Sequence, residues 1–238
     1  HLDKVNRNYN NLVNILGADH TGYIKRITAA VSAISDSKVK LNCKVCQLVK
    51  LYKNGEPFKM SKRAGDFISA QDLLNEVDKD QIRFMMLNRS NDVELDFDFV
   101  KVKEKTKDNP VFYVQYAYAR INSILRTLNI SLTNKPLLND DNFRLNEIEE
   151  KIIRKIFEWP KIIESTSKKF DLHKIPFYLY ELSTLFHAYW SKGNENKKFK
   201  FIENNKLKRK EILVIINLVA IVIQNGMKIL GVSLPNKM

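Results

Sequence analysis

With 238 residues, the chain is long for one domain and of comfortable length for two. Hydrophobic residues make up 44% and charged residues 28% of it, which excludes a disordered tail and leaves enough apolar material for a core. The 40 basic and 27 acidic residues give a formal net charge of +13. This surplus indicates either a polyanionic partner, nucleic acid or an anionic membrane, or a lysine-rich composition that only keeps the protein dissolved.

The first hundred residues alternate between short apolar runs and the 3-and-4 spacing typical of helices. The predicted elements are an apolar run over Asn11 to Leu16, a helix over Tyr23 to Ile34, a strand over Leu41 to Tyr52, and helices around Leu73 to Val77 and from Asp80 to Leu87. The pair Asn54-Gly55 predicts a hairpin whose return strand runs through Pro57 and Phe58. We therefore expect this part to be α/β.

Cys43 and Cys46 form a lone C-x-x-C pattern inside the predicted strand. A structural zinc site needs about four ligands, and no second Cys or His pair is near these two in the sequence. Residues three apart on a strand point to opposite faces, which argues against a disulfide or a shared metal ion. We therefore predict two buried thiols in a reducing compartment, and no metal site in this chain.

From Asp108 onward the pattern is helical throughout. Asp108-Asn109-Pro110 predicts a helix start, and apolar residues from Val111 to Leu128 then repeat at 3-4-3-4-3. The further predicted elements are a polar loop over Asn129 to Asn142, a helix that begins at a capping box of Asn146 and Glu149, a neighbour divided from it by Pro160, a helix that carries Ile175 to Tyr189, a polar loop over Lys192 to Asn205, and a last helix over Lys206 to Leu230 that Gly231 ends. The last helix is apolar almost all round over its middle, which predicts the centre of a helical bundle.

We expect neither a membrane span nor a signal peptide. The longest apolar run, Ile212 to Ile223, has 12 residues, whereas a bilayer span needs about 20. The chain opens without Met on His1-Leu2-Asp3-Lys4, a polar start without the apolar region of a signal peptide. These features predict the later part of a longer protein with no membrane partner.

The sharpest local signal is Lys59-Met60-Ser61-Lys62-Arg63-Ala64-Gly65, which follows the predicted hairpin directly. Two lysines three apart can place two ammonium groups on a polyphosphate, and Ser61 offers a hydroxyl and a backbone N–H beside them. On these residues alone, a basic surface turn is the more common interpretation. No glycine-rich phosphate loop accompanies the segment, so a nucleotide would have to be held in another way.

Lys59-Met60-Ser61-Lys62 resembles the second signature of class I aminoacyl-tRNA synthetases, and its surroundings resemble those of bacterial arginyl-tRNA synthetase. The blocks that carry the resemblance are Gly17 to Tyr23, Gln47 to Val49, Gly55 to Gly65, Arg83-Phe84 with Leu95 to Asp98, Asn109 to Val111 with Tyr113 to Ala117 and Ala119-Arg120, and Leu230 to Ser233 with Pro235. The resemblance covers the chain from end to end. It implies α/β followed by all-α: the C-terminal part of a class I Rossmann-like catalytic domain over residues 1–105, and a helical-bundle anticodon-binding domain over residues 106–238.

The resemblance implies an arginine-tRNA ligase, a cytoplasmic monomer that activates arginine with ATP and transfers it to the 3′ end of an arginine tRNA. ATP would be accompanied by Mg²⁺, with no protein-bound metal. None of the four histidines stands in the pattern of the family's first signature, which is therefore expected upstream of His1, so that this chain alone would be inactive. The alternative functions are a tRNA-binding module without ligase activity and a helical scaffold whose basic surface serves only solubility.

For the catalytic part, the resemblance implies that Lys59 and Lys62 stabilise the charge that develops on the leaving pyrophosphate, which accelerates the reaction because the interaction strengthens in the transition state. Met60 and Ser61 would join Lys62 in binding ATP. The resemblance also implies that three residues at a strand end lie beside the ATP ribose and the amino-acid pocket: Gly17, Asp19 and His20. On its own, Asp19 fits equally well as the N-cap of the helix that follows, and a lone histidine is usually structural.

Tyr113, Tyr116 and Arg120 lie at i, i+3 and i+7, so they share one face of the helix that begins at Pro110. Aromatic rings and a cation on such a face can stack unpaired bases and contact phosphate, with Phe186 and Trp190 as the opposite wall. Aromatic residues at helical spacing are more often core residues. The residues that the resemblance implies for tRNA binding are Tyr113, Tyr116, Arg120, Phe186, Trp190 and Met238, the last at the chain end that closes on the anticodon loop.

Overall fold

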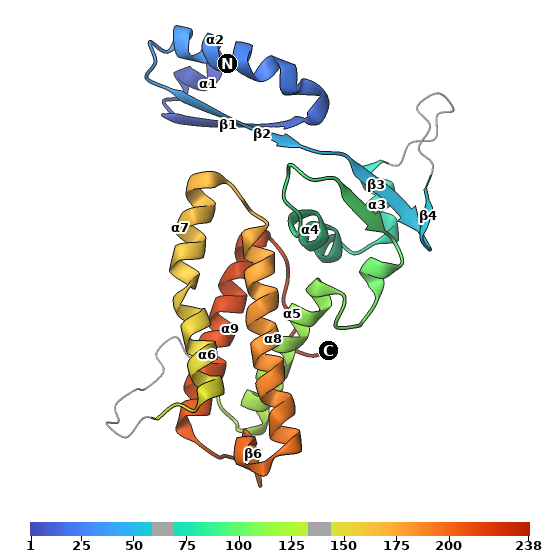
Figure 1. The fold of residues 1–238 in the computed structure, drawn as a ribbon, viewed down its shortest axis with the longest axis vertical. Helices are drawn as coiled ribbons and strands as arrows, with labels where there is room; N and C mark the ends of the chain where they lie inside the picture. Colours follow the sequence, from blue (N-terminus) through green and yellow to red (C-terminus); the bar gives the residue numbers. More distant parts are fainter. Residues whose placement is uncertain (59–68, 133–143) are drawn as a thin grey trace. The chain divides into compact units, whose positions relative to one another are not determined.

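The computed structural model describes residues 1–58, 69–132 and 144–238 (Figure 1). The chain divides into two compact units, one of His1–Lys59 with Arg89–Asp98 and the other of Met60–Asn88 with Phe99–Met238. Each unit has a hydrophobic core of its own. The segment Lys59 to Lys62, on which the sequence predicts catalytic and ATP-binding side chains, lies outside the described residues.

The first unit begins with a small parallel sheet covered by a helix. Its elements are α1 (Leu2–Asn6), β1 (Asn11–Gly17), the 3-10 helix η1 (Ala18–Tyr23), α2 (Ile24–Ile34) and β2 (Lys40–Cys46). Strands β1 and β2 pair in parallel, and Gly17 is opposite Cys46 in the register. Val31 of α2 packs against Leu12 and Leu41 of the two strands. This β-α-β arrangement confirms the α/β character that the sequence predicts.

A second small sheet completes this unit. It consists of β3 (Val49–Lys53), β4 (Glu56–Pro57) and β5 (Leu95–Asp98), in the order β4-β3-β5. The predicted hairpin is present: Asn54 and Gly55 adopt positive φ angles of 56° and 80°, which is the conformation that a tight turn between antiparallel strands requires. The Gly55 N–H donates a hydrogen bond of 2.9 Å to the Asp98 carboxylate, so β5 supports the turn.

The strand predicted over Leu41 to Tyr52 is in fact two strands, β2 and β3, that belong to different sheets. The strand is interrupted where the segment around Asn91 forms hydrogen bonds with it. The Gln47 N–H donates to the Asn91 carbonyl at 2.8 Å, and the Asn91 amide donates to the Val45 carbonyl at 2.7 Å. These bonds come from a part of the chain more than 40 residues away, which no local pattern reveals.

The prediction of two buried thiols is wrong. Both cysteines are free, but Cys43 is only half-buried and Cys46 is exposed. In the described residues β2 pairs with β1 alone, and α2 covers one face of the pair. A sheet of two strands is too small to enclose the side chains at the end of β2.

The second unit is mainly helical. Its elements are α3 (Ala70–Glu76), α4 (Lys79–Leu87), the 3-10 helix η2 (Lys101–Lys103), α5 (Pro110–Thr127), α6 (Glu147–Phe157), α7 (Trp159–Lys169), α8 (Lys174–Glu195), the 3-10 helix η3 (Lys197–Phe199), β6 (Ile202–Glu203), β7 (Lys206–Leu207) and α9 (Lys210–Leu230). Helices α5, α6, α8 and α9 pack together as the bundle, with α7 against α6 and α8 (Figure 1). The sequence predicts all five of these helices.

Several helix ends are as the sequence predicts. The Asn146 side chain accepts hydrogen bonds from the Ile148 and Glu149 N–H groups, and the Glu149 carboxylate accepts one from the Asn146 N–H, which completes the capping box. Gly231 ends α9 with a positive φ of 67°. Helix α9 begins at Lys210 rather than at Lys206, because Asn204 and Asn205 form a turn of positive φ and the chain first pairs back as β7.

Helix α9 supplies much of the bundle core, including the fully buried Ile215, Ile216, Val219 and Ile223. Among the described residues it is the helix long and apolar enough, by length and composition, to cross a membrane. However, 61% of its most apolar window is buried inside the bundle, as expected of a central helix. Phe84 of α4 joins the same core, which explains why α4 groups with the bundle although the sequence places residues 1–105 in a separate domain.

Candidate nucleic-acid interface

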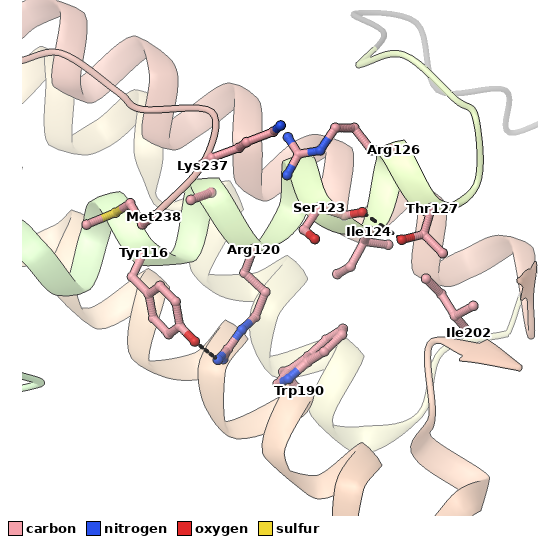
Figure 2. Close-up of a pocket in the computed structure, with 11 residues that line it drawn as sticks. Tyr116, Arg120, Ser123, Ile124, Arg126, Thr127, Trp190, Ile202, Lys237 and Met238 are labelled. Atoms are coloured by element: carbon pink, nitrogen blue, oxygen red, sulfur yellow. Dashed lines mark hydrogen bonds between the residues drawn. The ribbon is translucent and has the colours of Figure 1, made fainter.

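A groove of about 500 Å³ runs along α5 in the second unit (Figure 2). Its walls come from α5, from Trp190 of α8, from Ile202 of β6 and from the segment after α9. The lining residues are Tyr116, Ala119, Arg120, Ser123, Ile124, Arg126, Thr127, Trp190, Ile202, Lys237 and Met238. Four of the residues predicted for tRNA binding therefore line one groove: Tyr116, Arg120, Trp190 and Met238.

Arg120 lies at the centre of the aromatic part of this groove. One guanidinium nitrogen donates a hydrogen bond of 2.6 Å to the Tyr116 hydroxyl, and the guanidinium carbon lies 4.4 Å from the centroid of the Tyr116 ring. On its other side the same carbon is 5.3 Å from the centroid of Trp190. Figure 2 shows Tyr116 and Trp190 flanking the guanidinium. Two cation–π contacts thus order a side chain that would otherwise move freely.

The groove is positively charged. Arg126 and Lys237 add two cations to Arg120, and the described residues that line the groove include no Asp or Glu. Ser123 and Thr127 contribute hydroxyl groups along the same face of α5. Cations beside half-exposed aromatic rings can contact phosphate oxygens and stack unpaired bases at the same time. The arrangement is therefore suited to a single-stranded or looped nucleic acid.

Four lining residues of α5 form a longer pattern than the three residues predicted to share that face. Tyr116, Arg120, Ser123 and Thr127 follow one another at spacings of 4, 3 and 4 residues, which keeps them on one helix face. Extending the spacing rule by two turns would have found Ser123 and Thr127. Lys237 follows no helix pattern, and Arg126 lies beside this face rather than on it.

The segment after α9 is held against the bundle by side chains of α4 and α5. The Arg126 guanidinium donates to the Asn236 carbonyl at 2.9 Å, and the Gln115 amide donates to the Ser233 carbonyl at 3.0 Å. At the last residue of α9, the Arg83 guanidinium donates to the Leu230 carbonyl at 2.8 Å. These bonds bring Lys237 and Met238 to the groove.

Tyr113 lies on the same helix but not in the groove. It is half-buried, and its ring packs 4.3 Å from the His187 ring and 5.3 Å from the Tyr180 ring, centroid to centroid. Burial raises the pKa of the Tyr113 hydroxyl. This side chain therefore belongs to the layer beneath the groove.

The assignment of Phe186 to the opposite wall is wrong in this structure. Its side chain is fully buried in the bundle core, with its ring edge-on to Phe201. Residues four apart on a helix lie about 40° apart around its axis, and here that difference turns Phe186 inward and leaves Trp190 half-exposed. The general expectation that aromatic residues at helical spacing are core residues holds at this position.

His187, to which the sequence pattern gives no role, lies directly beneath Arg120. Its Nδ1 is 3.0 Å from a guanidinium nitrogen of Arg120, and its Nε2 is 3.1 Å from the Tyr113 carbonyl oxygen. Desolvation by burial lowers the pKa of His187 to about 4. The sequence gives no sign of this contact with Arg120, because the contact depends on how α8 packs against α5.

Gly17, Asp19 and His20 lie together in the first unit, where β1 ends and η1 begins. The Asp19 side chain is 81% exposed, and its carboxylate lies 3.7 Å from the His20 Nε2. A Cβ atom at Gly17 would lie 2.6 Å from the Asp19 carboxylate oxygen, so glycine allows that side chain to fold back over the strand end. Neither η1 nor α2 has a side-chain cap, which excludes the N-cap alternative for Asp19.

All the residues that line the groove lie in a segment that matches a known family. Residues 114–238 match the model of the DALR anticodon binding domain family. The arginine–tRNA ligase of Pelagibacter ubique is 56% identical over the whole chain, which covers 41% of that relative. A solved arginyl tRNA synthetase structure from Campylobacter jejuni superimposes with a TM-score of 0.83 at 30% identity, over all of this chain and 50% of that one.

A Thermus thermophilus arginyl-tRNA synthetase shares the fold, with a TM-score of 0.68 at 18% identity over 95% of this chain and 41% of that one. The chain thus spans about two fifths to one half of the length of these relatives. The resemblance that the sequence predicts is confirmed. Because the matched segment makes up more than half of it, the chain belongs to the DALR anticodon binding domain family.

Proposed function

We propose that the chain is the C-terminal part of a cytoplasmic, monomeric arginine–tRNA ligase. Residues 106–238 bind the anticodon loop of an arginine tRNA, and residues 1–105 form the C-terminal part of a class I Rossmann-like catalytic domain. The complete protein activates arginine with ATP, accompanied by Mg²⁺, and transfers it to the 3′ end of the tRNA. The proposal is supported by the 56% identity to an arginine–tRNA ligase over the whole chain.

The observation that carries the RNA-binding part is the groove on α5. Tyr116 and Trp190 on either side of Arg120 present two half-exposed rings on which unpaired bases can stack, with a cation between them. Arg126 and Lys237 in the same groove provide charge for the phosphates of a loop. The groove lies within the segment that matches the anticodon binding domain. Tyr113 supports this site from below.

The test measures the affinity of the 238-residue chain for two RNA stem-loops, one with an arginine anticodon and one with an unrelated anticodon. Replacing Tyr116 or Trp190 by Ala removes a stacking surface, which typically costs about 1–3 kcal/mol per base. We expect this loss for the cognate loop and a smaller loss for the other. Phe177→Ala is the matched control, because Phe177 is an aromatic residue on α8 that is 50% exposed and does not line the groove.

If both variants bound cognate and unrelated loops as the unchanged chain does, with circular dichroism spectra of a folded protein, the groove would not read the anticodon. Equal losses for both loops would indicate RNA binding without sequence discrimination. That result would favour a general RNA-binding module over a ligase domain.

For the catalytic part, we propose that Lys59 and Lys62 stabilise the leaving pyrophosphate, with Met60 and Ser61 beside them. Gly17, Asp19 and His20 then lie beside the ATP ribose and the amino-acid pocket. Exposed polar side chains at the carboxyl end of a parallel strand support this assignment, because ligands of parallel sheets bind at that edge.

The test of the catalytic part uses the complete protein that contains this chain. Lys62→Ala should slow adenylate formation, measured as pyrophosphate exchange, by about 10²- to 10³-fold, because it removes a cation that stabilises the transition state while arginine affinity stays nearly unchanged. Lys59→Ala should have a milder effect. Unchanged exchange in Lys62→Ala would remove the assignment.

A further inference from the structure

His187 is a buried polar side chain in the layer between α8 and α5. It is 5% exposed, and both of its ring nitrogens have a partner on α5, Arg120 and the Tyr113 carbonyl. Its ring also lies 5.5 Å from the Tyr116 ring, centroid to centroid, at an interplanar angle of 24°. One side chain of α8 therefore touches Tyr113, Tyr116 and Arg120, the three residues of α5 predicted to share a face.

The hydrogen bonds define the state of the imidazole. A guanidinium group is always protonated and can only donate, so the Nδ1 of His187 must accept from Arg120. The Nε2 must then carry the hydrogen and donate to the Tyr113 carbonyl. The titratable groups that face the ring are Tyr113, Tyr116 and Arg120, all on α5, with no carboxylate among the described residues that contact it. The neutral ring fits this environment, because protonation would place two cations side by side.

The same interactions restrict Arg120 from three directions. Tyr116 accepts from one guanidinium nitrogen and His187 from the other, while Trp190 lies against the remaining face. Arginine has a long side chain that loses much rotamer freedom when it binds a ligand, and a side chain ordered beforehand avoids that cost. Of these partners, His187 is the one buried beneath the groove, out of reach of a ligand.

We propose that His187 is a positioning residue, which holds the Arg120 guanidinium between Tyr116 and Trp190 in the orientation that receives an unpaired base of the anticodon loop. This inference rests on the proposed RNA-binding function and goes beyond it, because His187 itself touches no RNA. It assigns the specificity of the groove in part to a side chain of the core. A purely structural histidine would affect stability without acting through Arg120.

The experiment compares two substitutions of His187 in the 238-residue chain, with the cognate and unrelated stem-loops as probes. H187F keeps an aromatic ring but accepts no hydrogen bond from Arg120. H187Q retains one acceptor and one donor and can restore both bonds. We expect H187F to weaken cognate binding by about tenfold, the loss typical of one hydrogen bond to a charged group, and H187Q to recover most of it.

The decisive comparison repeats both substitutions in an R120A background. A positioning residue acts only through its partner, so H187F should cause no further loss once Arg120 is absent. Ile175→Val is the matched control for stability: it removes a buried methyl group from α8, 12 residues and about 18 Å along the helix from His187. Its RNA affinity should be unchanged. If H187F does not fold, H187N, whose shorter side chain cannot reach both partners, replaces it.

The outcomes distinguish failure of the proposed function from failure of the positioning role. If R120A binds both loops as the unchanged chain does, the proposed function of this groove fails and the inference fails with it. If R120A weakens binding but H187F does not, the RNA-binding function stands and the positioning role is overturned. An equal loss from H187F with and without Arg120 also overturns it, because the effect would not pass through Arg120.

Discussion

Phe186 and Trp190, four residues apart on α8, show how a small rotation around a helix separates a core residue from a binding residue. Phe186 is fully buried among bundle side chains. We therefore expect Phe186→Leu to lower the free energy of unfolding by about 1 kcal/mol, the usual cost of an apolar exchange in a packed core. RNA affinity should stay within about twofold of the unchanged chain, a difference of about 0.4 kcal/mol, because Phe186 does not line the groove.

Chemical denaturation and stem-loop binding, measured on the same preparation, check this expectation. Trp190→Leu is the matched control, and it should show the reverse pattern, with little change in stability and a clear loss of RNA affinity. A loss of RNA affinity in Phe186→Leu as large as that in Trp190→Leu would show that Phe186 takes part in RNA binding.

The burial of His187 also predicts how the free energy of unfolding depends on pH. Its folded-state pKa of about 4 lies below the ordinary value of 6.5, chiefly because burial disfavours the charged ring. Between these two values the unfolded chain binds a proton that the folded chain does not, so the free energy of unfolding falls as the pH falls from 6.5 to 4. H187Q cannot titrate and should show a smaller fall over this window. Urea denaturation at several pH values measures it, and equal pH profiles for both proteins would contradict the assignment.

At the scale of single residues, the sequence predicts Tyr116, Arg120 and Trp190 as a group. It does not predict the side chain that packs beneath them. Spacing along α5 identifies which side chains share a face, because the helix period is fixed. It does not determine which residue of another helix packs beneath that face. The spacing pattern therefore does not identify His187, although its hydrogen bond orders the Arg120 guanidinium.

At the scale of helices, the start of α6 is coupled to the start of α9 by an ion pair whose carboxylate is buried and whose arginine is half-buried. Glu149 is completely buried, and its carboxylate accepts hydrogen bonds from the Arg209 guanidinium at 3.0 and 3.1 Å and from the Tyr189 hydroxyl at 2.5 Å. The hydrogen bonds of Glu149 thus connect the capping box of α6 with Tyr189 of α8 and with Arg209, the residue before α9. Burial and the neighbouring Glu149 raise the pKa of Tyr189 well above its ordinary value, so the hydroxyl remains a donor.

Arg209→Met should destabilise the bundle strongly. It leaves the Glu149 carboxylate buried without its cation, and removing one partner of a buried pair typically costs about 3–5 kcal/mol. Adding Glu149→Gln should recover part of the loss, because the remaining group is then neutral. The free energy of unfolding from urea titrations of the single and double variants measures both effects. A loss below about 1 kcal/mol for Arg209→Met, which is typical of an exposed pair, would show that the pair is solvated.

Helices were more predictable than strands in this chain for a physical reason. The Asn146 capping box and Gly231 satisfy backbone groups within a few residues, and Pro110 has no backbone N–H that needs a partner, so the sequence alone identifies those ends. The division of the predicted strand into β2 and β3 depends instead on Asn91, more than 40 residues away. The exposed Cys46 follows from that division, because the small sheet does not cover its own end.

At the scale of the whole molecule, the net charge of +13 gives the protein an attraction for any RNA. Lys200 and Lys206 are exposed and flank β6, whose Ile202 lines the groove. Replacing both by Gln should weaken cognate and unrelated stem-loops by the same factor, because phosphate interactions carry no sequence information. It should also reduce the slope of log affinity against log salt by about 0.7 for each phosphate that the variant no longer neutralises.

Trp190→Ala should do the opposite: it should lower discrimination between the loops and leave the salt slope nearly unchanged, since a stacked ring releases no counterion. Lys161→Gln, an exposed lysine of α7 that does not line the groove, is the control for charge alone. Titrations at several salt concentrations measure slope and discrimination together. If the double lysine variant lost discrimination rather than general affinity, the surface around β6 would read bases, and the groove on α5 would be only part of the recognition site.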